Sequence, residues 1–244
     1  MKLFYFLIFV LVSSSLIAQD AEIRPAPRLP DGTPDFSGVW SGGGPVGDIA
    51  GGLMPGEVML LTEEYAAVKA GRMAADDPEA NCLPTGVPRI APYPWRMLQT
   101  PAYGPATHLY FIFEGNVHSY RQVFMDGREH PPEEELDPTW YGHSIGWWEG
   151  DTLVIDTVGF NDLTWFDFLG NPHSTELHTI ERYTRIDYNT LENITTVIDP
   201  AAYRQPFTIR FTARLQPDDW DIMEYVCNEN NQDVEHIRGP ARLF

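Results

Sequence analysis

The chain has 244 residues, of which 43% are hydrophobic and 13% aromatic, and its formal net charge at neutral pH is −19. This charge argues against nucleic acid and anionic membranes as partners, because both attract a basic surface. It does not by itself indicate a cationic substrate, since acidic side chains also keep exported proteins in solution.

Residues 1–19 have the features of a secretory signal peptide. Lys2 provides a positive start, the stretch from Leu3 to Val12 is uniformly apolar, and Ala18 lies at a suitable cleavage position. The apolar run is too short and too close to the terminus to indicate a membrane span. We therefore expect an exported protein, periplasmic or secreted, with no membrane span in the mature chain.

Residues 20–94 are predicted to form an irregular N-terminal arm, one short helix and loops that pack on the rest of the protein. Proline and glycine dominate the beginning of this region, and an extended piece is expected around Phe36 to Trp40. The helix is predicted from Thr62 to Gly71. Thr62 is a suitable N-cap, and acidic residues follow it in the first turn, where they complement the helix dipole.

The sequence pattern of residues 95–244 predicts a succession of β-strands. Short links join most neighbours, so we expect an antiparallel meander, and nine or so strands favour closure because a closed barrel has no exposed edges. The predicted fold is mainly β, a lipocalin-like barrel, with a two-layer sandwich as the alternative. The predicted strands are Trp95–Thr100, His108–Glu114, Val117–Met125, His143–Trp148, Thr152–Val158, Leu177–Ile186, Glu192–Ile198, Phe207–Leu215 and Ile222–Asn228.

The strand predicted at His108–Glu114 is apolar on both faces, which sets it apart from its neighbours. Leu109 and Phe111 face one way, and Tyr110 and Ile112 face the other way. A strand of this kind needs a cover on its outer side. We expect the N-terminal arm and the helix to provide that cover.

The chain contains two cysteines, Cys82 and Cys227. An even number of cysteines in an exported protein favours a disulfide. A bridge across so long a loop would contribute about 4 kcal/mol to stability. Two buried thiols are the alternative.

Seven histidines are present, and none has a compact metal-binding spacing. A divalent metal held by His143, His178 and a carboxylate is a weaker alternative, so no metal site is predicted. The nucleophile elbow, the phosphate-binding loop and the dinucleotide fingerprint do not occur in the sequence. We therefore predict no organic cofactor.

Strand alternation suggests which side chains converge. His118 and Tyr120 share one face of a strand, His178 and Arg182 share a face of another, and Glu224 lies among apolar residues. A cavity lined by these faces would suit acid–base chemistry, because a buried Glu has a raised pKa and His titrates near neutral pH. The alternative is that these histidines face solvent and that the arginines form ordinary ion pairs.

His143 begins a predicted hairpin, directly after Gly142 and close to Trp140 and Tyr141, and folding alone explains this residue least. We predict His143 and His178 as acid and base, with Tyr120 assisting and Glu181 or Glu224 orienting a histidine. Arg121 or Arg182 would hold an anionic group of the substrate. The predicted catalytic residues are His143, His178, Tyr120, Glu181 and Glu224. The predicted substrate-binding residues are Arg121, Arg182, Trp140, Tyr141, His118 and Trp165.

Several short sequence motifs resemble those of a known group of proteins. They include Gly-His-Ser-Ile-Gly at 142–146, Trp-Glu-Gly-Asp-Thr-Leu-Val-Ile-Asp-Thr at 148–157 and Glu-Arg-Tyr-Thr-Arg at 181–185. The chain resembles, over nearly all of its mature length, a broad group of exported bacterial proteins of unknown function. The resemblance implies a bacterial, exported origin and carries no activity. Trp147 stands where a basic or polar residue would be expected.

Two functions are consistent with these observations. The first is an exported enzyme that needs no organic cofactor and acts as a lyase, hydratase or isomerase on an amphipathic small molecule, aromatic or terpenoid in character. The second is a non-catalytic, lipocalin-like carrier of an apolar ligand. A domain without a pocket is a third. Catalysis requires two or more titratable side chains to converge within hydrogen-bond reach in a cavity, whereas a carrier needs only an apolar cavity with one or two polar anchors.

Overall fold

The computed structural model describes residues 24–89, 93–101, 104–115 and 119–229. The predicted signal peptide and His118 lie outside these residues. Among the described residues, no helix is long and apolar enough to cross a membrane.

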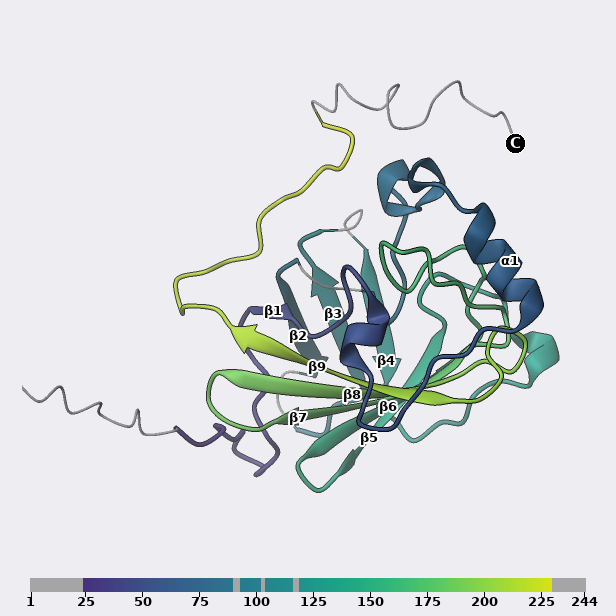
Figure 1. The fold of residues 1–244 in the computed structure, drawn as a ribbon. Coiled ribbons are helices and arrows are strands. Elements are labelled where there is room, and N and C mark those ends of the chain that lie inside the picture. The colour runs from purple at the N-terminus through teal and green to yellow at the C-terminus, as the bar shows by residue number, and fades with distance from the viewer. Residues whose placement is uncertain (1–23, 90–92, 102–103, 116–118, 230–244) are drawn as a thin grey trace, which may run out of the picture.

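The protein is a closed β-barrel of nine strands in sequence order, as Figure 1 shows. The prediction of a mainly β, lipocalin-like barrel is confirmed. The strands are β1 (Trp40–Gly42), β2 (Trp95–Thr100), β3 (His108–Phe113), β4 (Tyr120–Phe124), β5 (His143–Glu149), β6 (Thr152–Val158), β7 (His178–Arg185), β8 (Thr190–Ile198) and β9 (Phe207–Leu215). The helices are α1 (Glu63–Gly71) and the short 3-10 turns η1 (Ile49–Gly52), η2 (Ala74–Asp76), η3 (Glu79–Asn81) and η4 (Glu133–Glu135).

The strand that closes the barrel differs from the one predicted. The prediction of a last strand at Ile222–Asn228 is wrong, since that segment forms no strand and most of its side chains are exposed. Closure is made instead by β1, which pairs with both β2 and β9. The barrel thus includes residues on the N-terminal side of position 95.

One pair of neighbours departs from the predicted antiparallel meander. Strands β4 and β5 are parallel, whereas the other neighbours are antiparallel. A parallel pair requires the chain to return along the sheet before the second strand begins. Residues 125–142 make this return, and their last part is held by a parallel bridge between Thr139 and Phe160. We call residues 125–142 the crossover loop.

The inside of the barrel is filled mainly by aromatic and aliphatic side chains. Trp40, Trp95 and Phe111 are fully buried, with the two tryptophan rings stacked at a centroid distance of 6.5 Å. A second cluster, around Phe166, Tyr203 and other buried residues, fills the end of the barrel beneath the loops. Burial of these rings is the main source of stability.

Helix α1 begins as predicted, with the Thr62 side chain accepting a hydrogen bond from the backbone N–H of Tyr65 at 3.5 Å. The helix does not cover β3. Its Lys69 donates a hydrogen bond to Asn171, and its Arg72 side chain reaches the carbonyl of Gly170, so it lies against the loop before β7.

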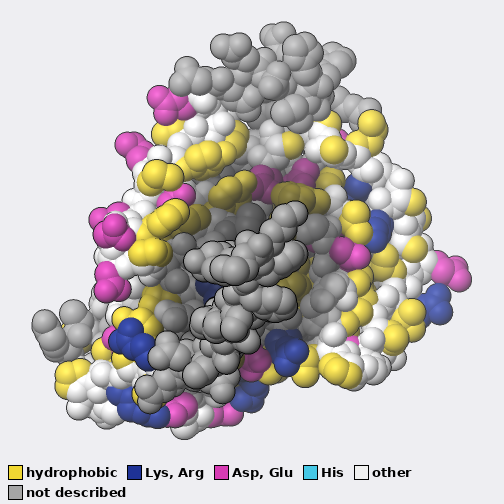
Figure 2. Space-filling view, turned by 60° about the vertical axis from the view of Figure 1, so that its left-hand side comes forward, with side chains coloured by type: hydrophobic (Ala, Val, Ile, Leu, Met, Phe, Trp, Pro, Cys, Tyr) yellow, Lys and Arg dark blue, Asp and Glu magenta, His cyan; other side chains and the backbone are white. Residues whose placement is uncertain are grey.

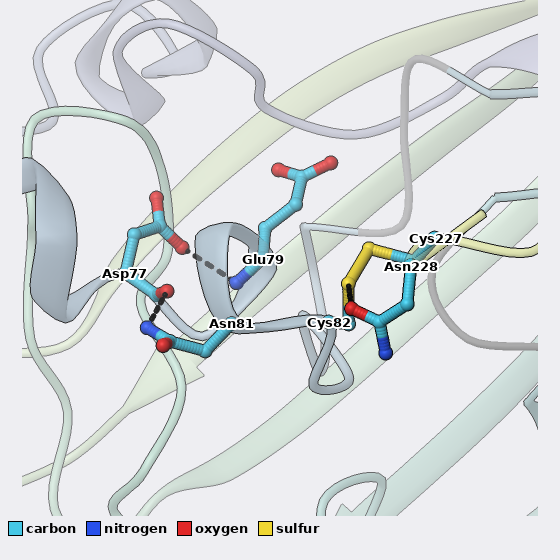
Figure 3. Close-up of a disulfide and its surroundings, with 6 residues drawn as sticks. All are labelled: Asp77, Glu79, Asn81, Cys82, Cys227 and Asn228. Atoms are coloured by element: carbon cyan, nitrogen blue, oxygen red, sulfur yellow. Dashed lines mark hydrogen bonds between the residues drawn. A yellow bond between two sulfur atoms is a disulfide. The ribbon is translucent and has the colours of Figure 1, made fainter. Parts of the chain in front are cut away.

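The C-terminal segment, residues 217–229, lies beside β2 and β3 instead. Arg96 forms an ion pair with Asp221 at 3.1 Å, and the Glu114 carboxylate accepts the backbone N–H of Met223. A disulfide between Cys82 and Cys227 holds the end of this segment, as Figure 3 shows. The predicted disulfide is confirmed, and the expectation that the arm and the helix cover β3 is replaced by this arrangement.

The loop that carries Cys82 is itself held by buried charges. Arg89 donates two hydrogen bonds of 2.9 Å to the carboxylate of Asp77 and a third to Glu79. The buried arginine thus offsets some of the acidic charge close to the disulfide.

On the surface, Figure 2 shows acidic side chains spread among apolar ones, with Lys and Arg mainly in the lower part of that face.

Candidate functional site

Four titratable side chains form a continuous hydrogen-bonded chain on the outer wall of the barrel. His143 Nδ1 lies 2.8 Å from His130 Nδ1, and His130 Nε2 lies 3.1 Å from Asp156 Oδ1. The same carboxylate oxygen lies 2.7 Å from His178 Nε2. We call His130, His143, Asp156 and His178 the histidine cluster.

The cluster is sheltered but accessible. The side chains of His130, Asp156 and His178 are 20%, 19% and 32% exposed. The ring of Phe124 stacks on His143 at a centroid distance of 5.0 Å, which limits the motion of that imidazole. A small molecule can therefore reach the cluster without opening the barrel.

The hydrogen bonds assign the tautomers of the neutral cluster. A carboxylate only accepts, so His130 and His178 each donate their Nε2–H to Asp156. His130 Nδ1 is then an acceptor and receives the Nδ1–H of His143. Among the described residues, nothing hydrogen-bonds to Nε2 of His143 or to Nδ1 of His178, so each has a free lone pair, as a general base requires.

The pKa values of the cluster are shifted in directions that fit this assignment. Burial, together with repulsion from His130 and Arg128, lowers the pKa of His143 below its usual value. Burial works to raise the pKa of Asp156, but the hydrogen bonds from His178 and His130 outweigh it and lower that pKa. At neutral pH the geometry therefore favours an unprotonated His143 beside an ionised Asp156.

The backbone explains why these side chains meet. His143, Asp156 and His178 lie at one end of β5, β6 and β7, on the outward-pointing parity of each strand. Gly142 precedes His143 with φ of +66°, and a Cβ there would lie 2.6 Å from the carbonyl oxygen of Val158. Only glycine brings the chain into β5 at this close approach. The crossover loop then supplies His130.

The predicted acid and base, His143 and His178, are thus brought into one hydrogen-bonded network, but through His130 and Asp156, which were not among the predicted site residues. His130 lies in a loop whose path depends on the parallel pairing of β4 and β5. Asp156 lies within β6, directly after the apolar residues Leu153 to Ile155, and pairs with Ile180 of β7. The signal that could have found it is a lone carboxylate within a β-branched strand.

The other outward-facing candidates lie away from the cluster or in ordinary ion pairs. Tyr120 is 61% exposed and packs edge-on against Tyr110. Arg182 forms an exposed ion pair with Glu149 at 2.7 Å. The strand faces that carry Tyr120, His178 and Arg182 point outward, so they do not line the inside of the barrel.

The inside of the barrel instead receives Arg121 and Glu181, which form a buried ion pair of 2.5 Å. Arg121 also donates to the hydroxyls of Ser144 and Thr157, and Tyr183 donates its hydroxyl to Glu181. Burial works to lower the pKa of Arg121, and Glu181 more than compensates, so the guanidinium stays charged. Arg121 thus has its ionic partner within the chain, and Glu181 faces away from His178.

The remaining predicted residues are dispersed. Glu224 is exposed in the C-terminal segment rather than buried among apolar residues, because that segment is not a strand. Tyr141 packs into the barrel, its hydroxyl 2.5 Å from that of Ser119, and burial raises its pKa to about 12. Trp165 is buried beneath the guanidinium of Arg72, and Trp140 is half-buried before the hairpin.

His173 shows how a structural histidine differs from the cluster. It is almost completely buried, its Nδ1–H donates to the carbonyl of Ser174, and its Nε2 accepts the hydroxyl of Thr164 at 2.5 Å. Burial lowers its pKa, so it stays neutral. Both ring nitrogens of His173 are occupied, whereas His143 and His178 each keep one nitrogen that no other described residue occupies.

Within the described part of the chain, no group of three or more His, Cys, Asp or Glu side chains has the arrangement of a metal site. The chemistry that the cluster itself offers is proton transfer, with Asp156 orienting two imidazoles and stabilising their protonated forms.

No family model, no curated protein and no solved structure matches this chain.

Proposed function

We propose that the protein is an exported enzyme that uses acid–base chemistry, without an organic cofactor, on an amphipathic small molecule of aromatic or terpenoid character. The observation that carries the proposal is the hydrogen-bonded series of His143, His130, Asp156 and His178 on the outer wall of the barrel. His143 is the base, His178 is the acid in its protonated form, and Asp156 is a positioning residue for His130 and His178.

The site of this proposed chemistry lies beneath the crossover loop and not within the barrel. His143 and His178, joined through His130 and Asp156, can remove a proton at one position of a substrate and return it at another. Such a transfer is common to isomerases, lyases and hydratases. The disulfide between Cys82 and Cys227 supports the exported location, because such bridges persist in oxidising compartments.

The proposal is tested by deuterium incorporation. A panel of aromatic and terpenoid ketones is incubated with the mature protein in heavy water, and loss of the proton signal next to the carbonyl is followed by NMR. His143→Asn and His178→Asn are expected to slow the exchange by about a hundredfold or more, in the range that general acid–base groups supply. Asp156→Asn is expected to change the pH profile as well as the rate.

His108→Gln is the matched control. His108 lies on the outward side of β3, with its Nδ1 2.9 Å from the Thr107 hydroxyl, and packs against the neighbouring Phe124 without a hydrogen bond to any cluster residue. This variant should exchange the ketones at the rate of the unmodified protein. Exchange that is equally fast in His143→Asn, His178→Asn and the control would contradict the proposal, as would exchange no faster than that of buffer across the panel.

A further inference from the structure

An apolar pocket lies at the end of the barrel remote from the histidine cluster. It has a volume of about 250 Å³ and is lined by Phe36, Met97, Leu109, Trp148 and Leu153, among others. Trp148 and Leu153 are paired at the hairpin end of β5 and β6, whereas His143 is paired with Val158 at the opposite end. The pocket is therefore separate from the cluster.

The N-terminal arm, drawn in purple in Figure 1, forms one wall of the pocket and is held firmly in place. Trp40 Nε1 donates to the carbonyl of Phe36 at 3.0 Å, and Arg185 donates to the carbonyl of Asp35 at 2.5 Å. The ring of Phe36 packs on Trp148 with centroids 5.3 Å apart. The pocket is thus formed before any ligand binds, which reduces the entropic cost of binding.

The polar side chains that line the pocket are Asp35, Ser37 and Gln99, and two of them identify the class of ligand. The Gln99 amide makes no hydrogen bond to any other described residue, and the Asp35 carboxylate accepts one, through Oδ1, from the N–H of Ser37. A hydroxyl group matches both partners, because it can accept from the amide and donate to the carboxylate. The carboxylate disfavours anions, and the apolar walls favour a ring or a short aliphatic skeleton.

We infer that this pocket binds a small neutral alcohol with an aromatic or compact cyclic skeleton. Its volume equals about eight water molecules at roughly 30 Å³ each and falls just below the usual range of small-molecule sites. A bicyclic alcohol fits this limit better than a long acyl chain. The inference is independent of the proposed acid–base function, because the two sites share no residue.

The test uses 1-naphthol and naphthalene as probes of the full mature protein, with binding measured by calorimetric titration and ligand-observed NMR. The unmodified protein should bind 1-naphthol more tightly than naphthalene. Gln99→Leu should weaken 1-naphthol binding by roughly three- to tenfold, the equivalent of one hydrogen bond, and should leave naphthalene binding unchanged or tighter. Met97→Trp should abolish binding of both probes by filling the pocket.

Gln122→Leu is the matched control, because it makes the same change on the outward side of β4 and should not alter binding. Folding of each variant is checked by circular dichroism, and Gln99→Leu at the rim decides the question if Met97→Trp does not fold. Failure of 1-naphthol to bind the unmodified protein would overturn the inference. So would binding that Gln99→Leu reduces no more than Gln122→Leu does.

Discussion

Asp156 is the residue on which the arrangement of the histidine cluster depends. One of its oxygens accepts from both His130 and His178, at 3.1 and 2.7 Å. A single carboxylate oxygen therefore fixes the orientation of both imidazoles. The lowered pKa values of His143 and Asp156 make folding stability depend on pH.

The sign of this dependence follows from the protons bound in each state. The pKa of His143 is lowered from 6.5, so just below that pH the unfolded chain binds more protons and stability falls as the pH is lowered. Asp156 stabilises the fold above its usual pKa of 3.8, and this contribution is lost as the pH falls through its lower folded value. Urea unfolding from about pH 7 to about pH 5 should show decreasing stability.

Two variants assign that pH dependence to the cluster. His143→Gln should reduce the slope of unfolding free energy against pH in the window below 6.5. Asp156→Asn should reduce the loss of stability at lower pH. An identical slope in His143→Gln and the unmodified protein would show that other groups dominate in this window.

The buried pair of Arg121 and Glu181 illustrates the opposite use of charge. Replacement of either partner alone leaves a charge inside the barrel without its counterion. Arg121→Met and Glu181→Gln should each lower the free energy of unfolding by about 3–5 kcal/mol, as measured by urea unfolding. The double variant Arg121→Met/Glu181→Met is the control and should be more stable than Arg121→Met. A loss below about 1 kcal/mol in both single variants would contradict a structural role.

The burial of Arg121 and Glu181 also shows which feature of the site could not be predicted from the sequence, namely which face of β7 points inward. Alternation identified the two faces of β7, but it did not say which face was inward. Because Glu181 carries a charge and His178 an imidazole, the sequence gives no reason to bury the carboxylate. Its partner, Arg121, lies 60 residues earlier in the chain. Long-range pairing of this kind decides which face of the strand points inward, and it is not visible in the local sequence pattern.

At the scale of elements, the sequence predicts β2, β6 and β9 to the residue. Each is bounded by loop or turn residues, β9 alternates between apolar and polar side chains, and β6 is rich in β-branched residues. Strand β1 has only three residues between glycine-rich segments and carries no such pattern. The segment at Ile222–Asn228 has the composition of a strand but finds no partner, because β1 already occupies the position beside β9. Competition for one edge is a property of the whole sheet.

The disulfide replaces hydrogen-bonded strand pairing in holding the C-terminal segment. It joins residues 145 positions apart, and its loss should lower the free energy of unfolding by about 4–5 kcal/mol in a chain-entropy description. Cys82→Ala/Cys227→Ala should show this loss in urea unfolding. The same variant should be cleaved faster by protease within residues 217–229, whereas cleavage elsewhere in the native state should change less. Equal stability with and without the bridge would contradict this assignment.

At the scale of the whole molecule, the barrel is closed by its shortest strand, β1. We call the pairing of β1 with β2 and β9 the seam. Strand β1 pairs with β9 at three positions and with β2 at one. The side chain that fixes this short strand is Trp40, which is fully buried, stacks near Trp95 and lies 4.9 Å from the guanidinium carbon of Arg185. The seam is therefore held by the packing of one residue more than by its few backbone hydrogen bonds.

Trp40→Ala should consequently open the barrel at a defined place. The loss of a buried tryptophan should lower the free energy of unfolding by about 3–5 kcal/mol. Amide hydrogen exchange should accelerate first in β9 and β2, which become edges, and last in β6 and β7, which keep both neighbours. Leu191→Ala, a buried change in the intact wall of β8, is the control and should not select β9 and β2. Equal acceleration in all strands of Trp40→Ala would mean that the barrel unfolds as one cooperative unit, without a seam at β1.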